Sequence, residues 1–185
     1  MEQKIQVAPR TLARMFVAIP LSNEARQRLK VMVKQYDSSL ERVVPEERWH
    51  ITLAWLGKVP RGKAEEWQRI TEPIQQIYVP VVRFSQVAQG RNKQQLWAYI
   101  QPTTALNNLR SLILKRFSVT NEEELNNFAP HVNLGRLKSE AQRFGPKTQA
   151  IGFSYVFDQV ILYESDVSEK EPTYIPKSRI VLPAA

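Results

Sequence analysis

The sequence predicts an α+β fold in which two similar lobes share a central cleft. Strand-like and helix-like segments are mixed along the chain, without the strict alternation that a doubly wound parallel sheet requires. The length of 185 residues suits one domain, or two small lobes with a common core. Because residues 1–11 have no hydrophobic periodicity, we expect them to form a flexible tail before a single domain at 12–185.

The first half of the chain contains two strand patterns, each followed by a helix pattern. The segment "RMFVAIP" is typical of a buried strand that ends at Pro20. Ser22 or Asn23 can cap the next helix, because apolar residues then recur at helical spacing as far as residue 40. We therefore expect a strand at 14–20, a helix after that cap, a strand at 49–57 ("WHITLAWLG"), and a helix at about 63–77 that Pro73 kinks or splits.

The second half repeats this mixture of strands and helices. Strand patterns flank the turn "QGRNKQ", and Thr103 or Thr104 can cap a helix that carries apolar residues up to Phe117. Polar stretches at 118–129 and 138–149 are predicted to be loops. The expected strands lie at 79–87, 95–101, 130–137 ("PHVNLGRL"), 151–165 as one long strand or a bent pair, and 178–183 ("SRIVLP"), which closes the sheet.

The composition excludes several classes of site. The chain has no cysteine, which rules out disulfides, thiolate zinc sites and thiol nucleophiles. The apolar run "MFVAIPL" is too short to span a membrane and lacks a signal-peptide cleavage pattern, so we expect a cytoplasmic protein. The net charge of +8 favours an anionic partner such as nucleic acid, although surface lysines and arginines also serve simply to keep a protein soluble.

A weak internal repeat relates the two halves of the chain, which contains only two histidines, His50 and His131. One shift of the sequence along itself, the repeat offset, lays His50 on His131. The repeat offset also superposes "RMFVAIPL" on "QLWAYIQP", and both segments lead into a capped helix. The same offset aligns Thr52 with Asn133. The repeated unit is a strand, a helix and a second strand that carries His-x-Thr or His-x-Asn, which predicts that each lobe brings one histidine strand to the cleft.

Each histidine strand is expected to present two polar side chains on one face. Residues i and i+2 of a strand point to the same side, so His50 projects with Thr52, and His131 with Asn133. Two imidazoles that face each other suit acid–base chemistry on a phosphodiester, because a neutral ring can take a proton from the attacking water while a protonated ring donates one to the departing oxygen. Thr52 and Asn133 are candidates for holding the nonbridging phosphate oxygens. This chemistry needs no metal and no cofactor.

The sequence also allows other uses of the two histidines. A single histidine in a strand is more often a hydrogen-bonded core residue than a catalyst, and the duplication is what argues against that interpretation here. A metal site would need carboxylates, and neither histidine has an Asp or Glu within two residues. A Ser-His-Asp triad lacks support, because the chain has no Gly-x-Ser-x-Gly elbow.

The two motifs resemble those of the two-histidine (2H) phosphoesterases, which carry two His-x-Thr/Ser motifs. Within that superfamily the sequence is similar to the bacterial and archaeal RNA 2',3'-cyclic phosphodiesterases, also called 2'-5' RNA ligase-like proteins. The likeness runs along nearly the whole chain, through "RMFVAIPL", "WHITLAWLGKV", "LWAYI", "FAPHVNLGRLK", "FDQVILYESDV" and "PTYIPKSRIVL". It implies a bilobal fold with antiparallel sheets around a central cleft and helices on the outside.

The resemblance also implies roles for individual residues. His50 and His131 would form the catalytic acid–base pair, and Thr52 would bind phosphate. Arg136 matches the arginine that follows the second motif in many members, where a guanidinium could neutralise phosphate charge, although a solvated arginine at a strand end is an equally good interpretation. Asn133 departs from the family pattern of Thr or Ser, so its amide would hold the phosphate differently.

The implied activity is metal-independent hydrolysis of RNA 2',3'-cyclic phosphate ends to 2'-phosphomonoesters. RNA or tRNA fragments with such ends would be the partners, and we expect a monomer. Phe128, in the loop before the second motif, is a candidate for stacking on a nucleobase. The alternatives are a noncatalytic RNA-end-binding module that has lost its rate through Asn133, a 2'-5' RNA ligase, and a phosphodiesterase for a small cyclic nucleotide.

Overall fold

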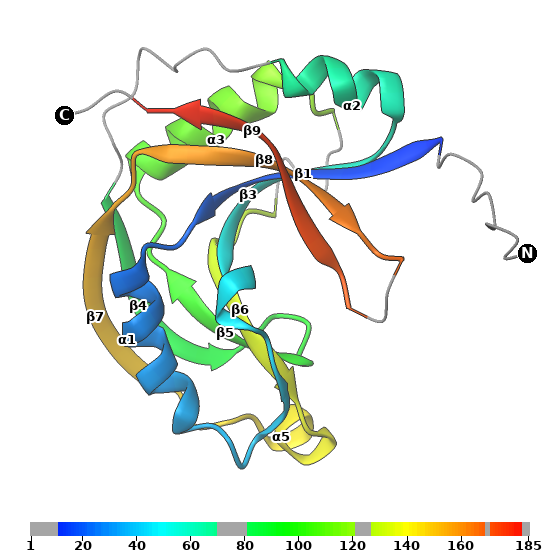
Figure 1. Cartoon of the computed structure of the whole chain (residues 1–185). Helices are drawn as coiled ribbons and strands as arrows, with labels where there is room; N and C mark the ends of the chain where they lie inside the picture. The colour runs from blue at the N-terminus through cyan, green and yellow to red at the C-terminus, as the bar shows by residue number, and fades with distance from the viewer. Residues whose placement is uncertain (1–10, 70–80, 121–126, 169–170, 183–185) are drawn as a thin grey trace, which may run out of the picture.

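Two antiparallel β-sheets stand opposite each other in the computed structural model, which describes residues 11–69, 81–120, 127–168 and 171–182 (Figure 1). Sheet A has the strand order β3-β1-β8-β9, and sheet B has the order β2-β6-β5-β4-β7. The strands are β1 (Leu12–Pro20), β2 (Leu40–Val43), β3 (His50–Pro60), β4 (Val81–Gln89), β5 (Gln95–Ile100), β6 (His131–Leu137), β7 (Gln149–Val156), β8 (Gln159–Asp166) and β9 (Thr173–Val181). The predicted α+β class with two antiparallel sheets is confirmed.

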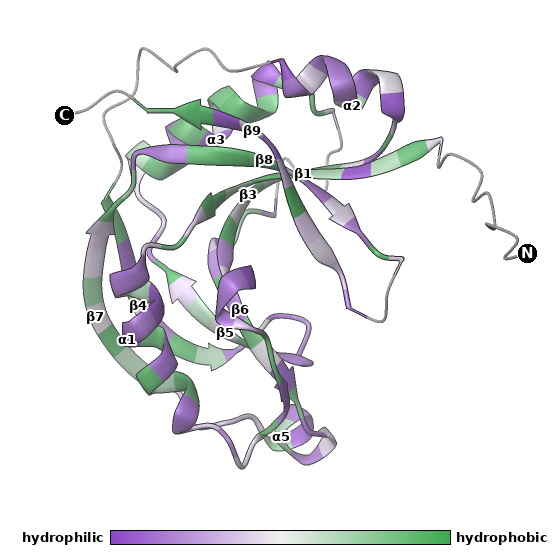
Figure 2. Cartoon of the chain, in the orientation of Figure 1, coloured by the Kyte–Doolittle hydropathy of each residue, from purple (hydrophilic) through white to green (hydrophobic). Residues whose placement is uncertain are grey.

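The helices are α1 (Asn23–Lys34), the 3-10 helix η1 (Glu46–Arg48), α2 (Arg61–Gln68), α3 (Thr104–Arg116) and α5 (Ser139–Phe144). Ser22 and Thr103, which the repeat offset superposes, cap α1 and α3 in the same way: each side-chain oxygen accepts a hydrogen bond from the backbone N–H three residues later. Green and purple residues alternate along α1 in Figure 2, because one face of this helix is buried and the other carries charges. No helix among the described residues is long and apolar enough to cross a lipid bilayer.

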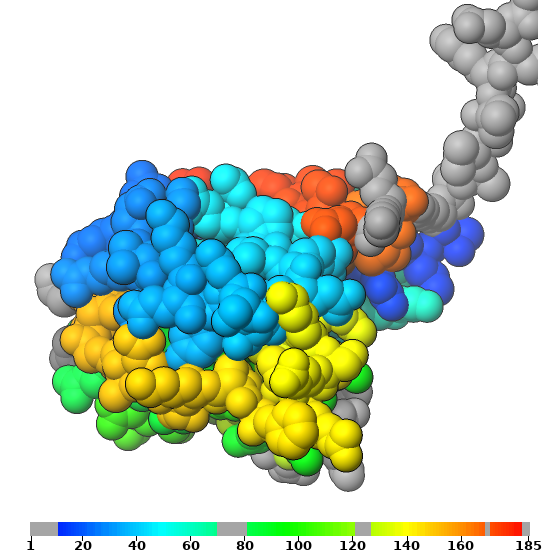
Figure 3. All heavy atoms as spheres, turned by 90° about the horizontal axis from the view of Figure 1, so that it is seen from below, coloured from blue at the N-terminus to red at the C-terminus, as the bar shows by residue number. Residues whose placement is uncertain are grey.

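The two long helices are exchanged between the lobes. α1 follows β1 of sheet A but lies along β7 of sheet B, as Figures 1 and 3 both show. The hydroxyl of Tyr36, just beyond α1, donates a hydrogen bond to the carbonyl of Lys147 (2.9 Å), and the Arg28 guanidinium lies over the Phe153 ring of β7. α3 follows β5 of sheet B and contacts β3 of sheet A as well as β4 of its own sheet. Each sheet is therefore covered by a helix from the other half of the chain.

The internal repeat is present in the pairing of the strands. β3 pairs antiparallel with β1, and β6 pairs antiparallel with β5. β3 bulges out of register twice, at Leu53 and at Leu56, and β6 bulges once against β5, at Leu134. Leu53 directly follows Thr52 and Leu134 directly follows Asn133, so the repeat offset carries the bulge beside the first motif onto the bulge beside the second.

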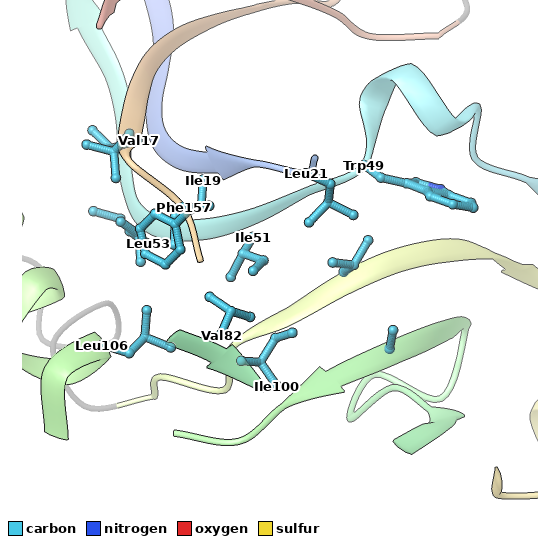
Figure 4. Close-up of a cluster of buried hydrophobic side chains, with 14 of the residues drawn as sticks. Val17, Ile19, Leu21, Trp49, Ile51, Leu53, Val82, Ile100, Leu106 and Phe157 are labelled. Atoms are coloured by element: carbon cyan, nitrogen blue, oxygen red, sulfur yellow. The ribbon is translucent and has the colours of Figure 1, made fainter. Parts of the chain in front are cut away.

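One apolar core lies between the sheets. The residues that alternate with the polar motif positions, Ile51 and Leu53 on β3 and Val132 and Leu134 on β6, are fully buried. In Figure 4, Ile51 lies across from Ile100 of the other sheet. The polar residues of both motifs therefore have to face away from this core.

Several predicted elements differ from the structure. Residues 151–165 form the bent pair rather than one strand, and its arms belong to different sheets, because the chain crosses between the lobes after β7. Leu40 fits the helical spacing, yet α1 ends at Lys34 and Leu40 begins β2; this side chain is buried in a strand as it would be in a helix. The loop predicted at 138–149 contains α5. The second predicted helix is shorter, Arg61–Gln68, while Pro73 and residues 1–10 of the predicted tail lie outside the described residues.

Gly135 of β6 allows β2 to lie against the sheet. A Cβ atom at this position would lie 2.6 Å from the backbone oxygen of Arg42 and 2.9 Å from the Leu40 side chain. Backbone cannot move aside without disturbing the β2–β6 pairing, so we predict that Gly135→Ala lowers the free energy of unfolding by about 1–3 kcal/mol in urea denaturation. Gly152→Ala in β7 is the matched control, because no atom lies within 4 Å of its added Cβ. Equal stability of the two variants would contradict this role for Gly135.

Candidate active site

The same backbone contact holds both histidines. His50 is the first residue of β3, and His131 is the first residue of β6. Nδ1 of each ring lies 2.7 Å from the carbonyl oxygen of the residue two positions earlier, Arg48 for His50 and Ala129 for His131. Because a carbonyl can only accept a hydrogen bond, Nδ1 carries the proton and Nε2 is the basic atom of each neutral ring. The two lobes thus present two imidazoles with the same fixed tautomer.

A cavity of about 260 Å³ is lined by both histidine strands. It brings together four residues that the sequence singled out: His50, Thr52, His131 and Asn133. The remaining lining residues are Arg42, Val44, Arg48, Gln95, Pro172 and Tyr174. A larger cavity of about 470 Å³ adjoins it and shares four of these residues: Arg48, His50, Pro172 and Tyr174. Among the described residues, no group of three or more histidine and acidic side chains could hold a metal ion.

The indole of Trp97 supports His131. Their ring centroids lie 3.5 Å apart and the two planes are inclined by only 12°. Trp97 is fixed in turn, because its Nε1 donates a hydrogen bond to Oε1 of Gln95 (2.9 Å). Gly90 leaves the space that this ring fills, since a Cβ added there would lie 2.5 Å from the indole. The plane of His131 is therefore set by a packed aromatic neighbour as well as by the Nδ1 hydrogen bond.

His50 has an aromatic neighbour at the equivalent position of its own lobe. The repeat offset superposes Phe16 on Trp97, and the Phe16 ring centroid lies 5.1 Å from that of His50. Tyr174 of β9 meets the imidazole edge-on, at 5.1 Å and 88°. The two lobes therefore support their histidines from the same backbone position but with different rings and different contacts.

Burial lowers the pKa of both histidines. For His50, desolvation lowers the pKa to about 4, against the hydrogen bond to the Arg48 carbonyl, which raises it, while the charges of His131 and Arg48 lower it further. For His131, desolvation lowers the pKa, the hydrogen bond to Ala129 raises it, and the charge of Arg91 lowers it. Both rings are neutral at pH 7 unless a negative charge enters the cleft.

Asn133 has an unusual environment for the residue that departs from the motif pattern. Its Oδ1 atom is buried and has no hydrogen-bond partner within the described parts of the chain. A buried acceptor without a donor typically costs about 1–3 kcal/mol. With the oxygen turned inward, the NH2 group is the end of the amide that remains for the cavity that Asn133 lines.

Arg136 lies at the edge of the site rather than in it. The bulge at Leu134 shifts the alternation of β6, so Arg136 is on the same face as His131. Its Nε donates a hydrogen bond to Glu41 (3.1 Å), and it is not among the described residues that line the cavity. Arg42, which pairs with Arg136 across the sheet, does line it.

The structure does not bring Phe128 to the two histidines. Its ring packs against the apolar core, and the Arg110 guanidinium lies 4.6 Å over it. Phe128 is also absent from the lining of the cavity in the described part of the chain. The stacking role expected for Phe128 therefore has no support from its position.

Four lining residues with polar side chains were not singled out from the sequence: Arg42, Arg48, Gln95 and Tyr174. Arg48 is close to His50 in the chain, but it belongs to η1, so strand alternation says nothing about its direction. Arg42 lies on β2, which the helical spacing concealed. The usable signal was the presence of two arginines shortly before His50 in the sequence.

The comparisons with known proteins agree with this geometry. A family model described as "LigT like Phosphoesterase" matches residues 19–97, which include the first motif but not the second. The RNA 2',3'-cyclic phosphodiesterase of Geobacillus stearothermophilus is 29% identical over 173 residues, which cover 86% of this chain and 54% of the relative. The crystal structure of E. coli LigT in apo form is 26% identical and has a TM-score of 0.72, with 93% of this chain and 98% of that chain covered. The chain is a homologue of the LigT-like phosphoesterases.

The match to solved LigT-like structures covers more of this chain than the family model does. A structure from Thermus thermophilus, at 20% identity, shows the same fold with a TM-score of 0.74 and covers 92% of this chain and 98% of that one. Coverage of more than nine-tenths extends well beyond residue 97, into the half that carries His131. This LigT-like homologue nevertheless spans about half the length of the curated relative that it matches.

Because both imidazoles are desolvated by burial, we predict that each titrates below the ordinary pKa of 6.5. The pKa of His50 is expected near 4. NMR of the ring protons measures both values, and His131→Gln leaves the His50 signals alone for assignment. A pKa of 6.5 or above for either ring would contradict the burial described here. Because the folded chain then binds fewer protons than the unfolded chain, its free energy of unfolding should fall as the pH is lowered from about 6.5 toward 4.

Proposed function

We propose that this protein hydrolyses RNA 2',3'-cyclic phosphate ends to 2'-phosphomonoesters, with His50 and His131 as the acid–base pair. The observation that carries the proposal is the pair of imidazoles on one cavity, each held through Nδ1 with Nε2 as its reactive atom. Homology to the LigT-like phosphoesterases supports it, as does the curated name of the Geobacillus relative. A crystal structure of E. coli LigT in complex with 3'-AMP also supports a nucleotide ligand for this fold.

The chemistry needs one neutral and one protonated histidine. Water attacks the phosphorus and gives its proton to the neutral ring, the P–O3' bond breaks, and the protonated ring donates its proton to O3'. Both rings are neutral at pH 7 on their own, but a bound phosphate brings a negative charge that raises the pKa of a nearby imidazole. The substrate thereby favours the protonation state that its own cleavage needs.

Charge that builds on the nonbridging oxygens needs donors fixed in advance. Thr52 and Asn133 line the cavity beside the two histidines and can donate from a hydroxyl and from an amide. The net charge of +8 favours the approach of a polyanion such as RNA to the cleft. No step of this sequence requires a bound metal ion.

The second candidate function is a noncatalytic module that binds RNA ends. The observation in its favour is Asn133, which replaces the expected hydroxyl and leaves its own Oδ1 buried without a partner among the described residues. Such a module would keep affinity for the cyclic end and lose turnover. A 2'-5' RNA ligase or a phosphodiesterase for a small cyclic nucleotide would use the same two histidines on other ends or other substrates.

We predict that the protein hydrolyses an oligoribonucleotide ending in a 2',3'-cyclic phosphate in the presence of EDTA. His50→Ala and His131→Ala should each lower kcat by about 10²–10⁴-fold, because each removes one proton-transfer group. Product analysis by ³¹P NMR should show a 2'-phosphate, since O3' is the leaving group. Arg28→Gln, on α1 away from the cleft, is the control for expression and folding. Hydrolysis that persists in both histidine variants would contradict the mechanism, and binding without turnover by the wild type would favour the module.

We predict that Asn133→Thr raises kcat/KM for the same substrate by about 3–10-fold. The variant restores the hydroxyl that Thr52 provides in the other lobe and removes the buried Oδ1 atom that lacks a donor. The reciprocal change, Thr52→Asn, should lower kcat/KM, which separates a chemical effect from a general effect of mutation. Unchanged kinetics in both variants would show that neither residue binds the phosphate.

A further inference from the structure

A carboxylate lies between two arginines at the edge of the histidine cavity. Both oxygens of Glu171, which precedes β9 in sheet A, accept hydrogen bonds: one from Arg42 (2.7 Å) and one from Arg48 (2.5 Å). Arg42 comes from β2 of sheet B, and Arg48 comes from η1. The bridge therefore joins the two lobes across the cleft.

The two arginines belong to the cavities as well as to the bridge. Both line the cavity that holds His50 and His131, and Arg48 also lines the larger adjoining cavity, as does Glu171. The Arg48 guanidinium lies 5.6 Å over the ring of Tyr174. The arginine pair thus lies where the cavity of the histidines continues into a second, larger space.

Glu171 does not use all the donors of this pair. Nε of Arg48 is buried and has no hydrogen-bond partner within the described residues. The hydrogen bond from Arg48, together with the charge of Arg42, lowers the pKa of Glu171, so the bridging group is an ionised carboxylate at neutral pH. A phosphodiester carries the same charge, and its two nonbridging oxygens match two guanidinium groups that face one anion. An exchange of carboxylate for phosphate would preserve the charge balance and offer an acceptor to the spare donor.

The anion that the pair now holds lies outside the cavity of the two histidines: Glu171 lines the larger adjoining cavity and is not among the described residues that line the smaller one. Arg42 pairs with Arg136, three residues along β6 from Asn133, which corresponds to roughly 10 Å of strand. The reacting phosphorus has to lie near the two imidazoles, beside Thr52 and Asn133. An anion on the arginine pair is therefore a different group of the same ligand.

We propose that Arg42 and Arg48 bind the internucleotide phosphate that precedes the 2',3'-cyclic phosphate, and that Glu171 occupies this subsite until RNA displaces it. The proposal rests on the proposed function and names its substrate class: an RNA end with at least one internucleotide linkage. A mononucleoside 2',3'-cyclic phosphate fills the histidine cavity alone and leaves the Glu171 bridge in place. RNA ends are therefore favoured over mononucleotides.

The test compares a dinucleotide that ends in a 2',3'-cyclic phosphate with the matching mononucleoside 2',3'-cyclic phosphate. The ratio of their kcat/KM values is measured for the wild type, Arg42→Gln, Arg48→Gln and Glu171→Gln. The wild type should prefer the dinucleotide. Each arginine variant should lower that preference about tenfold, because a charge-assisted hydrogen bond to the second phosphate is lost. Glu171→Gln should raise it about threefold, because the competing anion is gone.

Arg28→Gln is the matched control: it removes the same charge from an exposed ion pair on α1 and should leave the ratio unchanged. Thermal unfolding of each variant identifies any loss of folding, and Arg42 is the safer of the two sites because half of its side chain is exposed. An equal loss with both substrates would overturn the proposal, because the arginines would then act on the reacting phosphate. A lower preference for the dinucleotide in Glu171→Gln than in the wild type would also overturn the proposal.

Failure of the proposed function is distinguished by the wild type alone. If the wild type hydrolyses neither substrate, the proposed activity is wrong, and the same variants are compared by calorimetry with a dinucleotide and a mononucleotide that carry a 3'-phosphate. The subsite then predicts that the Kd for the mononucleotide divided by the Kd for the dinucleotide falls in the arginine variants and rises in Glu171→Gln. Equal dissociation constants of the wild type for the two ligands would overturn the subsite.

Discussion

Apolar packing between the two sheets sets the geometry on which the site depends. On β3, His50 and Thr52 alternate with Ile51 and Leu53, which are fully buried, and β6 repeats this pattern. Because successive side chains of a strand point to opposite faces, the packing of the buried residues decides where the polar residues point. A slip of one residue in either strand would turn a histidine into the apolar core and an isoleucine or a valine toward the cavity. The core therefore enforces the register of both motifs, and the proposed acid–base pair depends on contacts made on the other side of its strands.

The two lobes share a backbone but surround their histidines differently. His131 lies flat on an indole, whereas His50 meets Phe16 at an angle and Tyr174 edge-on. Desolvation lowers the pKa of both rings, to about 4 for His50, and the nearby charges that lower it further differ: His131 and Arg48 act on His50, and Arg91 acts on His131. The matched Nδ1 hydrogen bonds leave Nε2 as the basic atom of each neutral ring. The backbone support is therefore symmetric, while the contacts and charges around the two rings differ.

The sequence predicts the histidine pair well because the repeat supplies a constraint that one motif alone lacks. A single His-x-Thr strand is ordinary, but two of them at the offset that also superposes a strand and a capped helix require a common cleft. The alternation of each strand then places Thr52 and Asn133 beside the rings. These inferences rest on periodicity, which survives in any fold that pairs the strands.

The two arginines and the glutamate that bridges them come from segments too short to have a period. Arg42 lies on a strand of four residues, Arg48 on one turn of 3-10 helix, and Glu171 beside a chain reversal. The contact among these three residues depends on tertiary structure, which no local sequence pattern predicts. The position of Phe128 could not be predicted from the sequence for a related reason, because an aromatic residue before a motif can pack on a base or on the core; in the structure it packs against the core, with Arg110 over its ring.

The exchange of α1 and α3 between the lobes also determines whether one repeat could fold by itself. Each half of the chain builds a strand pair whose helix covers the sheet of the other half, so neither half has a complete core of its own. The repeat is therefore not a domain. A half-length chain with this architecture would need a second copy of itself, as a helix-swapped dimer with two identical motifs. In the single chain the two motifs can differ, as Asn133 differs from Thr52 and Trp97 from Phe16, while the shared core keeps the two histidine strands together.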